Sequence, residues 1–234
     1  MQRGEAWAPV AERVAQRYPS TLLDFARNSF TACVAQLIAA LAPGGVAVGY
    51  SMGGRIALLA TLREPARFGA LVLVGAGAGI ESGTERRARR MADESLAAWI
   101  ERHSIEQVVQ RWERQPVFAS QSPELVAAQR AGRLSHDPAG LATLLRSAGQ
   151  GAMAPVWERL GELTLPVLVI AGERDGAYAE VAQRMASALP HGRWQLVPGA
   201  GHAPQLERPA EVADALLEFL DEHLGQRPVV HGHA

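Results

Sequence analysis

Four short apolar runs, each bounded by glycine or proline, are the feature that most limits how this 234-residue chain can fold. Runs of β-branched and aliphatic residues of this length are typical of strands that are buried on both faces of a parallel sheet. Segments with helical periodicity follow three of the four runs. Because parallel strands need crossover connections between them, this alternation predicts an α/β fold with a mainly parallel sheet flanked by helices. The strand-like runs cover residues 46–50, 71–74, 167–171 and 194–197, and the helical segments cover residues 53–62, 178–189 and 210–224.

The alternation stops in the middle of the chain. From residue 84 to about residue 147 no strand-like run is present, and apolar residues such as Ile105, Val108, Val109 and Trp112 recur with helical spacing. We therefore expect a helical insertion, called the cap below, that lies over the carboxyl edge of the sheet. The predicted organisation is an N-terminal part of the core over residues 1–81, a helical cap over 82–150, a C-terminal part of the core over 151–225 and a flexible tail over 226–234.

The composition is that of an ordinary globular chain without a preference for a charged partner. Hydrophobic residues make up 48% of the chain, charged residues make up 20%, and the formal net charge is −1. We therefore expect neither nucleic acid nor a membrane as a partner. The single cysteine, Cys33, excludes an intrachain disulfide, and no zinc-like Cys/His spacing predicts a metal site. No signal peptide follows Met1, so we expect a cytoplasmic protein. The sequence leaves the oligomeric state open.

One serine stands between two glycines where the first strand-like run meets a helical segment. Residues 49–53 read Gly-Tyr-Ser-Met-Gly, which matches G-x-S-x-G in a strand-to-helix context. At such a sharp turn a Cβ at a flanking position would collide with nearby backbone, and the turn raises the hydroxyl of Ser51 above the sheet edge. An ordinary strand-to-helix loop is the alternative interpretation of the same five residues.

A carboxylate and an imidazole follow the third and fourth strand-like runs. Asp175 and His202 both lie in loops where parallel strands end, in the chain order Ser51, acid, histidine. In this arrangement His202 accepts the proton of Ser51, and Asp175 orients and stabilises the imidazolium that forms. Glu173 is the alternative acid, in which case Asp175 caps the helix that follows.

With these residues the chain resembles the α/β-hydrolase superfamily, and more narrowly the 2-succinyl-6-hydroxy-2,4-cyclohexadiene-1-carboxylate synthase family of menaquinone biosynthesis. The resemblance covers residues 45–220, and its narrower motifs are Glu-Arg-Arg-Ala-Arg at 85–89 and Trp-Glu-Arg-Gln-Pro-Val-Phe-Ala-Ser at 112–120. It implies a lyase that eliminates pyruvate from 2-succinyl-5-enolpyruvyl-6-hydroxy-3-cyclohexene-1-carboxylate and needs no metal or organic cofactor. The implied substrate is a small polycarboxylate.

The resemblance also implies which residues bind this substrate, because guanidinium groups bind carboxylates bidentately. The implied set is Arg55, Arg89, Trp112 and Arg130, with Tyr50 and Gln115 as weaker candidates and the backbone of Met52 as an oxyanion donor. From the residues alone, Trp112 is also consistent with a purely structural role in an apolar stripe. Arg86, Arg87 and Arg90 are expected on a solvated helix face.

The sequence departs from the family at its front. A second oxyanion N–H normally comes from a loop after an earlier strand, which carries His-Gly-Phe in this family. The His-Gly pairs of this chain, at 191–192 and 231–232, come too late. We therefore expect the N-terminal strands to be missing and the strand at 46–50 to have an unpaired edge. A strand at 21–24 that closes up, another chain, or a start of the protein upstream of Met1 would each cover that edge.

Two alternatives to the lyase remain at this point. A hydrolase of small esters or C–C bonds would use Ser51 as a covalent nucleophile. A truncated homologue of low activity would bind carboxylate ligands without turning them over, because the loss of one oxyanion donor typically lowers turnover about 10²–10³-fold.

Overall fold

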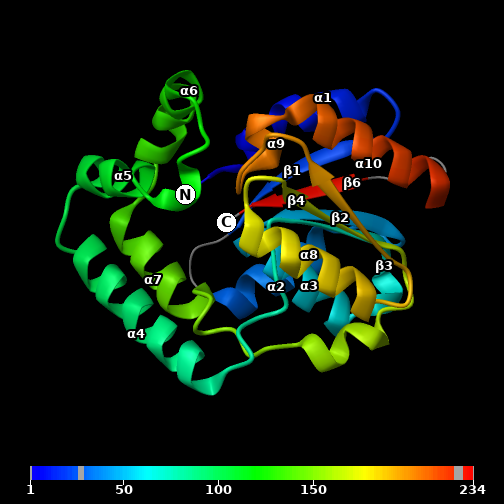
Figure 1. Cartoon of the computed structure of the whole chain (residues 1–234), viewed down its shortest axis with the longest axis horizontal. Coiled ribbons are helices and arrows are strands. Elements are labelled where there is room, and N and C mark those ends of the chain that lie inside the picture. The colour runs from blue at the N-terminus through cyan, green and yellow to red at the C-terminus, as the bar shows by residue number, and fades with distance from the viewer. Residues whose placement is uncertain (1, 26–28, 224–228, 234) are drawn as a thin grey trace.

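A single parallel sheet forms the centre of the computed structural model, which describes residues 2–25, 29–223 and 229–233. Within these ranges the sheet has six strands in the order β1, β6, β2, β3, β4, β5 (Figure 1). The pairing is parallel throughout. The predicted α/β class with a parallel sheet is confirmed. The strands are β1 (Ser20–Asp24), β2 (Gly45–Tyr50), β3 (Phe68–Val74), β4 (Val167–Gly172), β5 (Gly192–Val197) and β6 (Val229–His233).

Helices cover both faces of the sheet (Figure 1). Strand β3 illustrates why its sequence is continuously apolar: Leu71 and Leu73 pack on one face, and Val72 and Val74 pack on the other. The first face carries α2 (Phe30–Ala40), α3 (Met52–Arg63) and α8 (Gly176–Ala188), and the second carries α1 (Ala8–Ala15) and α10 (Pro209–His223). Short helical turns complete the core: η1 (Gly4–Trp7), η2 (Pro65–Arg67), η4 (Trp157–Glu162) and α9 (Pro204–Glu207).

The helical insertion lies between β3 and β4, beside the sheet (green in Figure 1). Its elements are α4 (Gly83–Ile100), α5 (Ile105–Glu113), η3 (Pro116–Phe118), α6 (Pro123–Leu134) and α7 (Pro138–Ala148). The cap has a small apolar core of its own, in which Ala97 and Ile100 of α4 meet Val108 of α5 and Ala142 of α7. Side chains of Ser104, Ser122 and Asp137 accept hydrogen bonds at the N-termini of α5, α6 and α7, which fixes where these helices begin.

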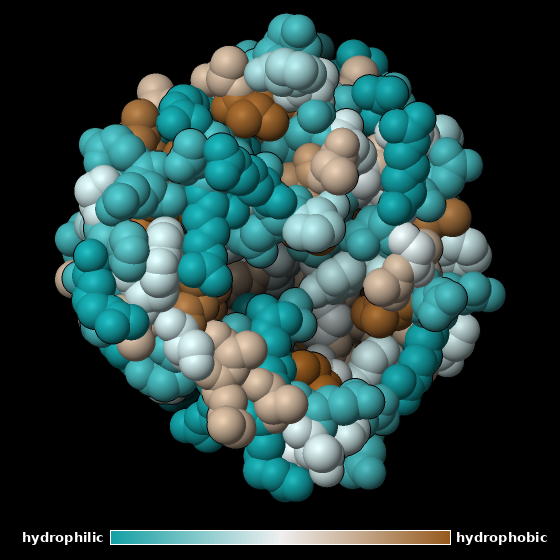
Figure 2. Space-filling model, turned by 60° about the vertical axis from the view of Figure 1, so that its left-hand side comes forward, coloured by the Kyte–Doolittle hydropathy of each residue, from teal (hydrophilic) through white to brown (hydrophobic). Residues whose placement is uncertain are grey.

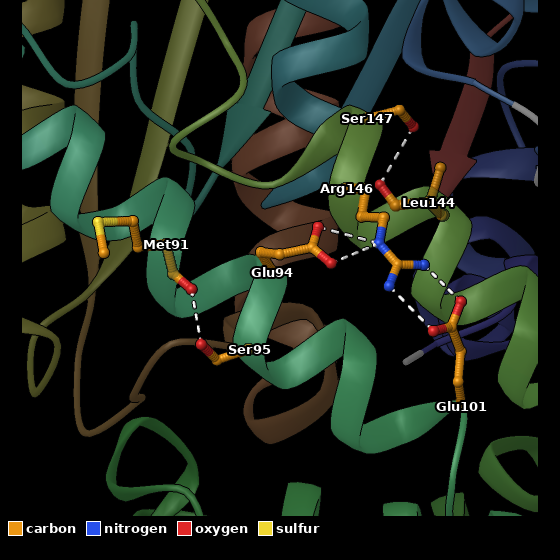
Figure 3. A network of polar contacts seen from close by, with 7 residues as sticks. All are labelled: Met91, Glu94, Ser95, Glu101, Leu144, Arg146 and Ser147. Atoms are coloured by element: carbon orange, nitrogen blue, oxygen red, sulfur yellow. Dashed lines mark hydrogen bonds and ion pairs between the residues drawn. The ribbon is translucent and has the colours of Figure 1, made fainter.

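Arg146 links the outer sides of α7 and α4 (Figure 3). Its Nε lies 3.0 Å from both carboxylate oxygens of Glu94, and its Nη2 lies 2.9 Å from Oε2 of Glu101. The hydrogen bonds from Arg146 hold the pKa of Glu101 below its ordinary value. The two ion pairs lie on the solvent side of the small apolar core, so charge and packing hold the same two helices together.

Strand β6 lies between β1 and β2, where the sequence predicts an unpaired edge. It pairs with β2 from Val46↔Val229 to Gly49↔Gly232 and with β1 on its other side. The edge of β2 is therefore covered by a later part of the same chain, which is none of the three explanations that the sequence suggests. A buried strand edge demands hydrogen-bond partners, and a segment with two adjacent valines supplies them.

The structure also differs from the flexible tail predicted for residues 226–234. Residues 229–233 form β6, whereas residues 226–228 and 234 lie outside the described residues. The difference has a simple origin, because the position of a segment along the chain does not fix its position in a sheet.

None of the helices in the described ranges combines the length and the apolar character needed to cross a membrane.

Candidate active site

Ser51 occupies a strained turn between β2 and α3. Its backbone has φ 50° and ψ −107°, and among the described residues it is the one residue other than glycine with a positive φ. The Ser51 N–H donates to the carbonyl of Val74 at 2.8 Å, and the Ser51 carbonyl accepts from Arg55 at 3.1 Å. A Cβ at Gly49 would stand 2.5 Å from the carbonyl oxygen of Gly53, which explains the need for glycine there. Strain held in place by both flanking elements is typical of functional positions.

A cavity of about 350 Å³ opens over this turn, between the core and the cap. The face shown in Figure 2 is hollowed near its centre, and hydrophilic residues form much of the rim of the hollow. The core contributes Tyr50, Ser51, Met52, Tyr178 and His202 to the cavity wall, and the cap contributes Arg89, Trp112, Gln115 and Phe118. The structure thus brings six of the nine predicted site residues, and the weaker candidate Gln115, to one cavity.

His202 and Asp175 are in direct contact. The Nδ1 atom of His202 lies 2.6 Å from Oδ2 of Asp175, and both side chains are largely buried. The alternative acid, Glu173, accepts a hydrogen bond from the N–H of Gly199 at 2.8 Å and makes no contact of this kind with His202 in the described structure. The geometry therefore favours Asp175 as the partner of the imidazole.

The loop that carries His202 is fixed by residues that sequence reasoning missed. The carboxylate of Glu207 accepts hydrogen bonds from the N–H groups of Gly201 and Ala203, at 2.8 and 3.2 Å. The ring of Tyr178 packs 4.6 Å from the imidazole. These contacts hold the ring at the wall of the cavity that Ser51 also lines. Within the described residues no hydrogen bond joins the Ser51 hydroxyl to His202; such bonds are often long without a ligand and tighten in the substrate complex.

Arg89 reaches the cavity from α4 and is held in place by two neighbours. Its Nε lies 2.8 Å from Oδ1 of Asp93, and its Nη1 donates to the amide oxygen of Gln150 at 3.2 Å. Gln150 in turn donates to the hydroxyl of Tyr178 at 2.5 Å. This chain of contacts connects the cap to the core and leaves part of the guanidinium facing the cavity.

Arg55 is buried one turn after Ser51, but it lines a separate pocket. That pocket, of about 230 Å³, shares Gln150 and Tyr178 with the larger cavity. Burial lowers the pKa of Arg55 to about 10, so the side chain remains cationic at neutral pH. Its Nη1 has no hydrogen-bond partner among the described residues. A buried cation with a free donor is costly without an anion, which makes this pocket suited to a carboxylate.

The structure does not bring Arg130 to the cavity. Arg130 lies on the outer side of α6, 44% exposed, and pairs there with Glu113. Arg133, three residues later, is 2% exposed, contacts Glu113 at 3.2 Å and Gln121 at 3.3 Å, and lines a neighbouring pocket.

Tyr50, in the wall of the cavity, is affected by the charge of Arg133. Burial raises the pKa of Tyr50 well above its usual value, and the positive charge of Arg133 opposes that rise.

Arg133 was missed because helical spacing alone does not separate it from Arg130. The partly buried residues Val126 and Gln129 lie four residues before Arg130 and Arg133, respectively. Gln150, Tyr178 and Gln2 were also missed, because isolated polar residues outside a motif give no signal of their own. Within the described part of the chain, no group of three or more His, Cys, Asp or Glu side chains could hold a metal ion.

Comparisons with known proteins identify the family of this chain. A model of the Alpha/beta hydrolase family matches residues 3–215. A Bacillus subtilis protein, provisionally named 2-succinyl-6-hydroxy-2,4-cyclohexadiene-1-carboxylate synthase, is 38% identical over 176 residues, which cover 74% of this chain and 64% of the relative. A Salmonella schwarzengrund protein named as the same synthase is 32% identical over 173 residues, which cover 74% of this chain and 67% of the relative. The chain thus spans less than two thirds of the Bacillus protein.

Solved structures show the same architecture. MenH from S. aureus superposes with a TM-score of 0.85 at 26% identity, covering 95% of this chain and 90% of the other. A thermophilic esterase from Thermogutta terrifontis superposes with a TM-score of 0.74 at 22% identity, covering 95% and 87%, and shows the shared fold alone. A serine on a strand-to-helix turn, followed in the chain by an acid and a histidine at the ends of later parallel strands, is the arrangement of one family. The chain belongs to the α/β-hydrolase family.

Proposed function

We propose that this chain is a cofactor-independent carbon–oxygen lyase that converts 2-succinyl-5-enolpyruvyl-6-hydroxy-3-cyclohexene-1-carboxylate into 2-succinyl-6-hydroxy-2,4-cyclohexadiene-1-carboxylate and pyruvate. The observation that carries the proposal is the 2.6 Å contact between His202 and Asp175 at a cavity that Ser51 and the cap residue Arg89 also line. The names of the Bacillus and Salmonella relatives support the choice of reaction.

The proposed chemistry begins at Ser51. His202 takes the hydroxyl proton while Asp175 stabilises the imidazolium, so that the serine oxygen acts as a base. This oxygen removes a proton from a ring carbon of the substrate. The electron pair of the broken C–H bond forms the new ring double bond, and the bond between the ring and the enolpyruvyl oxygen breaks. The enolpyruvyl oxygen takes the proton from the His202 imidazolium as it leaves, and the enol tautomerises to pyruvate. The proton removed from the ring stays on Ser51, so both residues return to their resting state. The balance requires no redox step.

Substrate recognition is assigned to the cations around the cavity. Arg89 faces the cavity from the cap, and Arg55 offers a free donor in the adjoining pocket. The substrate carries several carboxylates, and charge-assisted hydrogen bonds to guanidinium groups are about twice as strong as neutral ones. Trp112 and Tyr50 supply ring surface at the same cavity. Arg130 is not retained as a contact, since Glu113 holds it outside the cavity.

The test is to supply the enolpyruvyl precursor to the purified chain and to follow pyruvate through a coupled dehydrogenase. We expect release that depends on the chain and disappears in Ser51→Ala. Comparable or faster turnover of a nitrophenyl ester would overturn the lyase in favour of a hydrolase. Binding of the precursor by calorimetry without pyruvate release would overturn it in favour of a carboxylate-binding homologue.

A further inference from the structure

The strand beside the nucleophile strand comes from the far end of this chain. Strand β6 follows α10 in the sequence, yet in the sheet it lies between β1 and β2 and is parallel to both. Parallel strands end at the same edge of a sheet, so β6 ends at the edge where β2 delivers Ser51. The segment of the chain that the sequence assigns to a tail is therefore next to the turn that carries the nucleophile.

The register of β6 against β2 and β1 shows which residues of β6 lie nearest to Ser51. Gly49 of β2 is the partner of Gly232, and on the other side Asp24 of β1 is the partner of His233. His233 is thus one step beyond the Gly49↔Gly232 pair, beside Tyr50 and one residue short of the level of Ser51. Its backbone stands at the carboxyl edge of the sheet on the side of β2 opposite β3.

The beginning of the chain meets β6 at this same edge. Turn η1 contacts both β1 and β6, and the N–H of Gly4 donates to the carboxylate of Asp24 at 2.8 Å. Gln2 lines the cavity of Ser51, and Arg3 holds the cap through a 2.7 Å hydrogen bond to Ser135. The beginning of the chain therefore lines the cavity and contacts the last strand, although about 230 residues separate the two segments.

The proposed reaction builds negative charge on a substrate oxygen, and enzymes of this fold stabilise it with two backbone donors. Met52 supplies one, because the first N–H groups of a helix such as α3 have no partner within the helix. The other normally follows a strand that precedes the nucleophile in the chain. Of the strands in the described part of this chain, β6 is the one that borders β2 on that side.

Resting on the function proposed above, we infer that the backbone N–H of His233 is the second oxyanion donor and that the strand carrying it is β6, which follows α10 in this chain. This strand order leaves the sheet and the catalytic edge intact. It makes the C-terminal strand a part of the catalytic machinery, with the backbone of Gly232 as the positioning residue that pairs with Gly49.

The proposed donor is tested by removing the backbone N–H of residue 233. His233→Pro removes the N–H, whereas His233→Ala keeps it and changes the side chain alone. Because both variants lack the imidazole, the proline variant is compared with the alanine variant, and we expect it to have about 10²–10³-fold lower kcat than the alanine variant with little difference in KM. If proline lowers the melting temperature, the same loss is sought with an amide-to-ester replacement at residue 233, introduced by ligating a synthetic C-terminal peptide. Equal kcat for the variants with and without the N–H would overturn the assignment.

The strand order is tested without any substrate. A rearranged gene begins at residue 229, continues through 233, joins residue 2 by a short linker and ends at residue 223. We expect this chain to melt within a few degrees of the original, and a chain that lacks residues 224–234 to melt far lower or to aggregate. A rearranged chain that fails to fold, or a truncated chain of unchanged stability, would overturn the placement. If the original chain releases no pyruvate, the proposed function fails, and this comparison still decides the strand order.

Discussion

His202 and Asp175 meet at 2.6 Å, although 27 residues separate them, because β4 and β5 are neighbours and deliver their loops to one edge of the sheet. The contact joins a carboxylate to Nδ1 of the imidazole, and therefore leaves Nε2 as the nitrogen available to the cavity. In a serine-centred triad this is the tautomer that a carboxylate partner maintains.

Replacing Asp175 by asparagine should therefore keep the fold and lower kcat about 10⁴-fold, because the amide favours the wrong imidazole tautomer. Pyruvate release from the enolpyruvyl precursor measures the effect. Glu173→Gln is the matched control, since Glu173 contacts Gly199 and is expected to change kcat less than threefold. The opposite ranking of the two variants would assign the acid to Glu173.

Substitutions of Ser51 test whether the turn between β2 and α3 is strained. A residue other than glycine at φ 50° is strained, whereas glycine adopts this conformation without steric conflict. Both Ser51→Gly and Ser51→Ala remove the hydroxyl and should abolish turnover. The glycine variant should be more stable than the alanine variant by about 1 kcal/mol, or roughly 2–4 °C in melting temperature. Thermal unfolding of the two variants by circular dichroism is the measurement, and equal melting temperatures would remove the case for strain.

Arg55 should contribute more to substrate binding than to the stability of the folded chain. Its burial lowers the pKa to about 10, and Nη1 has no partner in the described structure, so the folded state bears the cost of a buried charge. Arg55→Met should raise the melting temperature by a few degrees and weaken substrate binding, as a rise in KM of tenfold or more.

The pH dependence of Arg55 has a definite sign. The folded pKa lies below the ordinary value of an arginine, so above about pH 10 the unfolded chain binds more protons at this residue and its contribution to stability rises with pH. Urea midpoints measured against pH in the parent and in Arg55→Met should converge above this pH. A parallel pair of curves would contradict the lowered pKa.

Arg130 and Arg133 form a matched pair on one helix. Arg133 is buried against Glu113 and Gln121, so Arg133→Gln should destabilise the chain by about 3 kcal/mol, as expected when a buried ion pair loses one partner. Arg130 is exposed, and Arg130→Gln should change stability by less than about 1 kcal/mol. Urea denaturation decides between them, and a larger loss for Arg130 would mean that the two arginines are exchanged in the folded chain.

The ion pairs of Arg146 should stabilise the contact between α4 and α7 in the cap. Arg146→Gln should lower the melting temperature at low salt, and the difference from the parent should shrink in 1 M salt, because the pairs with Glu94 and Glu101 are exposed and screened. The pKa of Glu101 is held below its ordinary value of 4.5, so this stabilisation is present above that pH and is lost as the pH falls through the lowered pKa. Arg159→Gln, which breaks an exposed pair within η4, is a control that leaves the contact between α4 and α7 intact.

Much of this protein could be predicted from short-range patterns. The strands at 46–50 and 167–171 differ from β2 and β4 by a single residue at one end, because a strand buried on both faces needs a continuous apolar run and glycine or proline beside it. The turn at Ser51 was visible because its glycines are required by local geometry. The positions of Asp175 and His202 followed because parallel strands share a carboxyl edge.

Side-chain direction was harder to predict. Arg130 and Arg133 differ by three residues, and a rotation of α6 of less than one turn decides which of them is buried against Glu113. Arg55 lies in phase with Ser51, as the sequence suggests, but the packing of Gln150 and Tyr178 divides the space into two pockets and assigns Arg55 to the second.

The sequence by itself determined the α/β class, the strained serine turn and the order of serine, acid and histidine, since each of these can be recognised from separate motifs that are only a few residues long. Only the tertiary structure decided which strand borders β2. That choice depends on the pairing of β2 with β6, in which the partners Val46 and Val229 are about 180 positions apart, and no periodicity in the chain reports a pairing over such a distance. The buried edge of β2 needs a partner, and in this protein the chain supplies it from β6.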